Sequence, residues 1–198
     1  MTTIPLLNGF RVPGIPEEQL FWLLHASMFR QYCKKVEHLQ AGFCSLCQLD
    51  TDINRVVCKN DSWIAWPNPW PQPNQEHHLV IAHREHFKHV AELDPDSDWK
   101  DLGKLVRELT RMHYQIEGGV FAMRFGEPKL SLASEEHLHA NIRVPDGSGP
   151  VAVTVAWNEN QARDKVRIAC IFEEIRAGRT SFEQLLPDER RLVEKFMD

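Results

Sequence analysis

The stretch from His137 to Pro145 reads His-Leu-His-Ala-Asn-Ile-Arg-Val-Pro, and it decides the predicted fold. With the two-residue period of a β-strand, its side chains divide into two faces. The apolar face consists of Leu138, Ala140, Ile142 and Val144. The polar face consists of His137, His139, Asn141 and Arg143. A half-buried antiparallel strand with its polar side in water would explain the alternation. Two histidines beside an amide and a guanidinium also offer a nucleophile or metal ligand next to groups that hold phosphate.

Composition and charge limit the possible functions. The 198 residues are 42% hydrophobic and 26% charged, which is typical of a globular chain with one sizeable core. The net charge of -5 argues against broad contact with a nucleic-acid duplex, so an anionic ligand would need a local pocket. No apolar run approaches the roughly 20 residues of a membrane span, and residues 1–11 lack a signal pattern. We expect a cytoplasmic protein that does not contact membranes.

The five cysteines fit free thiols and a possible metal pair better than a disulfide framework. In Cys44-Ser45-Leu46-Cys47 the two-residue gap lets both thiolates turn toward one ion. Two small buried residues in a loop are the alternative. Cys33, Cys58 and Cys170 have no such neighbours, and we expect them to be core residues.

Periodicity and turn residues predict a few antiparallel strands with flanking helices, an α+β fold with a sheet of about five strands. The expected strands are 55–58, 62–66, 78–82, 120–125, 137–145 and 151–157. The expected helices are 17–40, one that starts at 95–97 and ends before Gly118, 160–177 and 188–197. Thr180 and Glu183 have the spacing of a capping box. We expect one domain over 1–198, with a core at about 44–157 and helical extensions at 1–43 and 158–198.

Two further segments suggest a site. Four prolines between 67 and 73 exclude regular structure, and Trp63, Trp66 and Trp70 could line this loop as an aromatic wall or belong to the core. Four histidines lie between 77 and 86, which favours at least one ligand among them. In the helix that starts near Pro95, the stripe that includes Trp99 and His113 is expected to face the core.

Three of these segments together resemble the histidine triad (HIT) superfamily, and the match spans about residues 44–145. They are the Cys44-x-x-Cys47 pair, the apolar strand before His86, and the segment from His137. The last segment of the family reads His, apolar, His, apolar, His, apolar, apolar. This sequence departs from it with Asn141 at the third histidine and Arg143 at an apolar position. One branch of the family, which includes dinucleoside-polyphosphate phosphorylases and hexose-phosphate uridylyltransferases, has glutamine at that third position.

The resemblance implies an enzyme that hydrolyses or transfers a nucleotidyl group from a nucleoside phosphate, such as a dinucleoside polyphosphate or a nucleoside phosphoramidate. His139 corresponds to the nucleophile that briefly carries the nucleotidyl group, and a neutral imidazole suits that role near pH 7. Asn141 would donate to a phosphate oxygen or to the leaving group. An amide cannot act as a general acid, so protonation of the leaving group would fall to substrate, water or another side chain.

The resemblance also suggests substrate contacts. Ser134 lies where the family commonly has a phosphate-binding Ser or Thr, although it could be an ordinary loop serine. Arg124 lies where relatives often have Asn, and it could neutralise phosphate or be a surface charge. Asn68 corresponds to the residue that contacts the ribose hydroxyls, and Trp66 or Trp70 could flank the base.

The family members that keep a metal use two cysteines and two histidines. Carried over, the ligands are Cys44, Cys47, His86 and His137, with His83 as a substitute if His86 points away. A closed set of two cysteines and two histidines would make the zinc structural, so it would not activate water.

Two other hypotheses remain beside the enzyme. The missing third histidine suggests a non-catalytic nucleotide sensor or interaction module, which would bind nucleotide without turnover. A zinc-stabilised structural domain without nucleotide leaves His139 and Asn141 unexplained. Family members are usually homodimers, and the helix stripes here permit that.

Overall fold

The computed structural model describes residues 9–49 and 54–197. The chain forms two compact units, Cys44–Val155 and a second unit built from Met1–Phe43 and Ala156–Asp198. We describe each unit by itself. The division of one domain into a core and two extensions stays a prediction.

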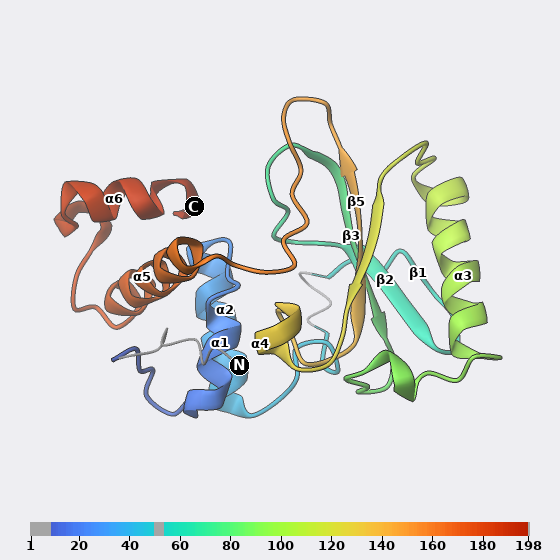
Figure 1. The fold of residues 1–198 in the computed structure, drawn as a ribbon, viewed down its shortest axis with the longest axis horizontal. Coiled ribbons are helices and arrows are strands. Elements are labelled where there is room, and N and C mark those ends of the chain that lie inside the picture. The colour runs from blue at the N-terminus through green and yellow to red at the C-terminus, as the bar shows by residue number, and fades with distance from the viewer. Residues whose placement is uncertain (1–8, 50–53, 198) are drawn as a thin grey trace. The chain divides into compact units, whose positions relative to one another are not determined.

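The first unit contains one antiparallel sheet of five strands in the order β1-β2-β3-β5-β4. Figure 1 labels β1, β2, β3 and β5 of this sheet. The α+β class and the sheet of about five strands are therefore confirmed. The strands are β1 (Cys58–Lys59), β2 (Trp63–Pro67), β3 (Gln75–His83), β4 (Val120–Arg124) and β5 (His139–Pro145). β5 begins two residues later than expected, so His137 precedes the strand.

The alternation in β5 is confirmed. Its apolar side chains and Leu138 join the main core cluster with side chains of β2, β3 and the helix α3 (Asp98–Glu108). Full burial of a Leu or Ile side chain contributes about 1.5–3 kcal/mol. A slip of one residue would turn the whole set to the other face, so this burial fixes the register that also places His139 and Asn141.

The helix that starts near Pro95 differs from the predicted one. α3 ends at Glu108, and a π-helix, η4 (Leu109–His113), continues it. Leu102, Leu105 and Leu109 are buried, but Trp99 and His113 are exposed. The prediction that Trp99 and His113 face the core was therefore wrong. The buried side of α3 starts at Asp98 and continues through Leu102 and Leu105, so Trp99 lies beside it. The change from α to π geometry after Glu108 breaks the 3.6-residue period before His113. The unit also contains η3 (Val90–Glu92) and α4 (Pro128–Ser131).

The predicted strand at 151–157 was wrong, since none of these residues is in a strand. Two carbonyl groups of this segment accept hydrogen bonds from side chains and not from a neighbouring strand. The carbonyl of Ala152 accepts a hydrogen bond from Arg143 at 2.8 Å, and that of Thr154 accepts one from Arg124 at 2.6 Å. This segment therefore lies along the sheet face that carries both arginines.

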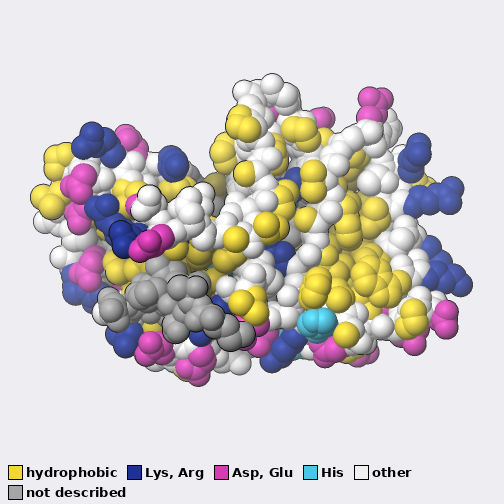
Figure 2. All heavy atoms as spheres, in the orientation of Figure 1, with side chains coloured by type: hydrophobic (Ala, Val, Ile, Leu, Met, Phe, Trp, Pro, Cys, Tyr) yellow, Lys and Arg dark blue, Asp and Glu magenta, His cyan; other side chains and the backbone are white. Residues whose placement is uncertain are grey.

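β4 is an edge strand, and it exposes large hydrophobic side chains. Val120, Phe121 and Phe125 are each at least 44% exposed. Figure 2 shows hydrophobic side chains gathered between β4 and α3. A cavity of about 660 Å³ lies there, lined among others by Val106 and Ile116. An exposed apolar edge of this kind is a place where another chain can pair.

The second unit is helical. Its elements are η2 (Glu17–Gln19), α1 (Leu20–Leu23), α2 (Phe29–Ala41), α5 (Glu159–Arg176), η5 (Phe182–Gln184), α6 (Pro187–Val193) and η6 (Glu194–Phe196). The single helix predicted for 17–40 is interrupted, because Gln31 Oε1 accepts hydrogen bonds from the backbone and hydroxyl of Ser27 and α2 starts anew there. The helix does end at Gly42, whose φ of 71° is typical of a C-terminal glycine.

Buried polar contacts hold α2 and α5 together. The Tyr32 hydroxyl donates to Glu173 Oε2 at 3.1 Å, and Arg176 makes two hydrogen bonds of 2.8 Å to the same carboxylate.

The predicted capping box lies one residue later than expected, since Gln184 Oε1 accepts from the backbone N–H of Ser181. Among the described residues, no helix is long and apolar enough to cross a membrane.

Candidate functional site

His139 is held in one orientation by the backbone. Its ring is 6% exposed, and its Nδ1 lies 2.8 Å from the carbonyl oxygen of His137. Because a carbonyl oxygen only accepts hydrogen bonds, Nδ1 carries the proton and Nε2 carries the lone pair. This tautomer gives the ring a nucleophilic nitrogen at the atom farthest from the backbone.

Strand pairing sets the residues around His139. His139 pairs with Ala82 of β3 and with Arg124 of β4, so these side chains share its face. Asn141 is likewise flanked by Val80 and Ala122. The two alanines leave more room above the strand than larger residues would, while Arg124 brings a positive charge beside the imidazole.

Asn141 belongs to a hydrogen-bond chain that continues through His78 to Asn68. His78 Nε2 lies 3.0 Å from Asn141 Oδ1, and Asn68 Nδ2 lies 3.3 Å from His78 Nδ1 and 3.2 Å from His78 Nε2. Because Nε2 donates to Asn141, Nδ1 is the ring nitrogen that can accept from Asn68. Burial lowers the pKa of His78 to about 4, against the opposite effect of the Asn141 hydrogen bond. The ring is therefore neutral near pH 7 and donates through Nε2 while it accepts through Nδ1. With Oδ1 engaged, the amide group that Asn141 can offer to a ligand is its NH₂.

Two arginines share this face, of which Arg143 is buried and Arg124 is half-buried. Arg124 donates to Thr154 through Nη2, and Arg143 donates through Nη1 to Gln72 at 2.9 Å and to Ala152. Burial lowers the pKa of both, and the Arg124 charge lowers that of Arg143 further. No carboxylate within the described ranges pairs with either guanidinium.

The Nε of Arg124 is buried and has no hydrogen-bond partner. Buried donors are almost always paired, so an orphaned guanidinium N–H beside His139 points to a ligand with acceptor oxygens. The sequence left open whether Arg124 is a charge on the surface. In the structure its side chain is partly buried.

The four predicted metal ligands come together in the sheet unit. The ligand atoms of Cys44, Cys47, His86 and His137 all lie within 4.8 Å of one another. Cys44 Sγ is 3.5 Å and Cys47 Sγ is 3.3 Å from His137 Nδ1, and Cys47 Sγ is 3.2 Å from His86 Nδ1. Around a tetrahedral zinc ion with ordinary bond lengths, sulfur and nitrogen ligands lie about 3.5 Å apart. The donor set and its spacing therefore fit zinc.

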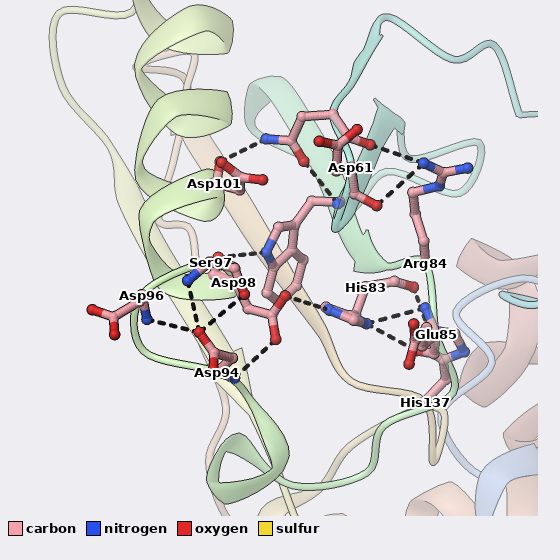
Figure 3. A network of polar contacts seen from close by, with 12 residues as sticks. Asp61, His83, Arg84, Glu85, Asp94, Asp96, Ser97, Asp98, Asp101 and His137 are labelled. Carbon is pink, nitrogen blue, oxygen red and sulfur yellow. Dashed lines mark hydrogen bonds and ion pairs between the residues drawn. The ribbon is translucent and has the colours of Figure 1, made fainter.

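The outer nitrogen of His137 is fixed by a polar network that Figure 3 shows. His137 Nε2 lies 2.6 Å from the carbonyl oxygen of His83, so it donates and leaves Nδ1 to face the sulfurs. The His83 ring in turn lies 3.4 Å from Asp98 Oδ1, and the Trp63 indole donates to the Asp98 carbonyl at 2.8 Å. His83 thus supports His137 through its carbonyl group, and the imidazole that joins the two cysteines and His137 in the cluster is that of His86.

The remaining predicted residues lie nearby but have other contacts. Asn68 Oδ1 accepts from the backbone N–H of Trp70 at 2.9 Å, so both ends of its amide are engaged within the protein. Trp66 is 2% exposed and packs with Val80 and Ala82 on the face of His139. Trp70 and Ser134 are half-buried.

Sequence reasoning missed His78 and gave Arg143 no place among the site residues. The cluster of histidines at 77–86 was a signal for His78, but choosing between His77 and His78 needs the pairing of β3 with β5. Asp98 was missed too, because its role depends on contacts with His83 and Trp63 that no local pattern reveals.

Comparison with known proteins gives similarities of fold to histidine triad proteins. No protein-family model matches the sequence, and no curated protein matches it. A HIT family hydrolase from Clostridium thermocellum has 17% identity and a TM-score of 0.45, over 57% of this chain and 98% of that one. A histidine triad nucleotide-binding protein from Candida albicans has 15% identity and a TM-score of 0.45, over 69% and 96%. A Zn-bound histidine triad family protein from Mycobacterium smegmatis has 13% identity and a TM-score of 0.42, over 68% and 96%. Because these TM-scores are below 0.5, we base the functional assignment on the atoms of the site.

Proposed function

We propose that this chain is a nucleotidyl hydrolase or transferase of the histidine triad type, with His139 as its nucleophile. The observation that supports it most is the hydrogen bond from His139 Nδ1 to the His137 carbonyl, which leaves the Nε2 lone pair on a face with Arg124 and Asn141. An imidazole that is fixed in one orientation beside a guanidinium suits attack on phosphorus.

The proposed reaction has two steps. His139 Nε2 attacks the α-phosphorus of a nucleoside phosphate, so a P–N bond forms and the P–O bond to the leaving group breaks with its electron pair. Water, or a phosphate acceptor, then attacks the same phosphorus, and the P–N bond breaks to restore the imidazole. Arg124 neutralises the phosphate oxygens throughout, and Ser134 is proposed to hydrogen-bond them.

Asn141 sets the range of leaving groups. Its Oδ1 is bound to His78, so its NH₂ donates to a phosphate oxygen or to the leaving oxygen. Because the amide carries no titratable proton, leaving groups that are stable as anions are favoured, such as the phosphates released from a dinucleoside polyphosphate. Amine leaving groups, as in phosphoramidates, require another proton source.

The nucleoside is proposed to bind at the end of β2 and the proline-rich loop after it. Trp70, which is half-buried, would flank the base, whereas Trp66 is 2% exposed and would support the site from below. Asn68 would contact the ribose after release of one of its internal hydrogen bonds. Zinc would be held by Cys44, Cys47, His86 and His137 with no open position. It would fasten the loop that carries the cysteines to the start of β5, with no part in the chemistry.

The decisive experiment is a screen of nucleotides and dinucleoside polyphosphates with wild-type protein and His139→Ala, in which released mononucleotide is measured. We expect turnover only with wild type, and an adduct of one nucleotidyl group by mass spectrometry of the quenched protein. Full activity of His139→Ala would refute the role of His139. Because Asn141 replaces a possible acid, nucleotide binding without turnover or adduct would instead favour a sensor.

We further propose a homodimer in which the β4 edges of two chains meet. Val120, Phe121 and Phe125 expose apolar surface along this edge, next to the cavity beside α3. Phe121→Glu should then shift the mass measured by sedimentation from dimer to monomer. A wild-type monomer at all concentrations would exclude this proposal.

A further inference from the structure

A second cluster of potential metal ligands lies on the other face of the sheet. It consists of Cys58 on β1, Glu108 at the end of α3 and His113 at the end of η4, whose ligand atoms all lie within 4.8 Å of one another. His113 Nε2 is 3.2 Å from Glu108 Oε1. Cys58 is 8% exposed and packs in the cluster that includes the buried side of β5, so this group is separate from both His139 and the Cys44 set.

The π-helix is what brings His113 to Glu108. In an α-helix, residues five apart lie about 140° away from each other around the axis. In η4 the backbone N–H of Tyr114 bonds to the carbonyl of Leu109 at 3.0 Å, five residues earlier. This wider turn places the side chain of residue 113 above that of residue 108. Such π segments are rare, and they occur frequently at functional sites.

The donor chemistry selects the kind of ion. Thiolate, imidazole and carboxylate are all ligands of zinc, whereas a thiolate does not suit Mg²⁺ or Ca²⁺. The alternative, a Cys58 nucleophile with His113 as base, is disfavoured by the environment of the sulfur. Reactive cysteines lie in exposed, positively charged surroundings, but Cys58 is buried and faces a carboxylate.

We propose that Cys58, Glu108 and His113 form a second transition-metal site, of the class that binds Zn²⁺. Three protein ligands leave a fourth position open, in contrast to the closed set at Cys44, Cys47, His86 and His137. His113 is exposed and Glu108 is half-buried, so small rotations of these two side chains can bring the ligand atoms to about 3.5 Å from one another. The open position faces solvent through His113 and would hold water.

Metal binding by the full-length protein tests the site. The chain is stripped with chelator and titrated with Zn²⁺ alone, and with Co²⁺ alone, whose thiolate charge-transfer absorption reports sulfur coordination. We expect two ions per wild-type chain. His113→Ala, at an exposed position that leaves the fold intact, should weaken one of the two sites at least about tenfold. Cys58→Ser should remove part of the charge-transfer absorption, and Cys170→Ser is the matched thiol control without effect.

The double variant Cys44→Ala/Cys47→Ala separates the two sites. In this background the Cys44 set keeps only its two histidines and no thiolate, so the thiolate charge-transfer band of cobalt that remains comes from Cys58 and should disappear on the further change His113→Ala. The proposal is overturned if the double variant Cys44→Ala/Cys47→Ala binds no ion, or if His113→Ala binds as many ions as wild type and as tightly. His113→Ala should leave nucleotide turnover unchanged, so a failure here is distinct from a failure at His139.

Discussion

Lowering the pH should weaken the fold through one buried histidine, His78. Burial lowers its pKa from 6.5 to about 4. The unfolded chain takes up this proton near pH 6.5 and the folded chain only near pH 4, so the unfolded state binds more protons between these values. The stability present above pH 6.5 is therefore lost as the pH falls toward 4. At about 1.4 kcal/mol for each pKa unit, the loss amounts to about 3 kcal/mol.

The measurement is the free energy of unfolding in urea, from about pH 7.5 to about pH 4, for wild type and His78→Gln. Glutamine can still donate to Asn141, but it does not titrate. The difference between the two proteins cancels contributions from other groups, among them His137, whose pKa burial also lowers to about 4. We expect the variant to lose about 3 kcal/mol less than wild type over this range. Equal losses, or an NMR titration of the His78 ring near pH 6.5, would refute the reasoning.

Three further predictions follow from single contacts. Arg124→Gln should weaken nucleotide binding about tenfold to a hundredfold in calorimetry, because a charge-assisted hydrogen bond contributes about 1.5–3 kcal/mol, and Arg124→Lys should recover part of the loss. Removal of zinc by chelator should lower the melting temperature of wild type, while Cys47→Ala should start lower and respond less to the same chelator. Glu173→Ala should destabilise the helical unit by about 1–3 kcal/mol, because it leaves the buried Tyr32 hydroxyl without its acceptor and Arg176 without its carboxylate, and a free energy of chemical unfolding equal to that of wild type would contradict this.

The parts that could be predicted from sequence are those encoded by local period or by residue type. The alternation from Leu138 to Val144 gave the buried face of β5, since every second side chain must face the same side. The metal ligands were predicted from the family resemblance as Cys44, Cys47, His86 and His137. In the structure their ligand atoms lie within 4.8 Å of one another. A structural role for zinc at this cluster stays a proposal.

The parts that could not be predicted depend on partners far along the chain. Arg143 binds a carbonyl nine residues later, and Arg124 binds one 30 residues later. These side-chain hydrogen bonds take the place of the backbone hydrogen bonds to a neighbouring strand that residues 151–157 would need to form a strand. No local sequence pattern reveals them. The interruption of the helix near Ser27 would have been easier to predict, because a serine four residues before Gln31 is close to the spacing of a capping box.

The two departures from the family's pattern are linked by this geometry. In the proposed reaction Asn141 offers no proton to the leaving oxygen, while Arg143, which is buried, and Arg124, which is half-buried, place two positive charges on the same face. A proton and a fixed positive charge are alternative ways to stabilise negative charge that develops on a leaving group. Charge suffices when the leaving group is a stable anion such as a phosphate, and a proton is needed when it is an amine. We therefore infer that the same substitutions that disfavour phosphoramidates favour polyphosphates.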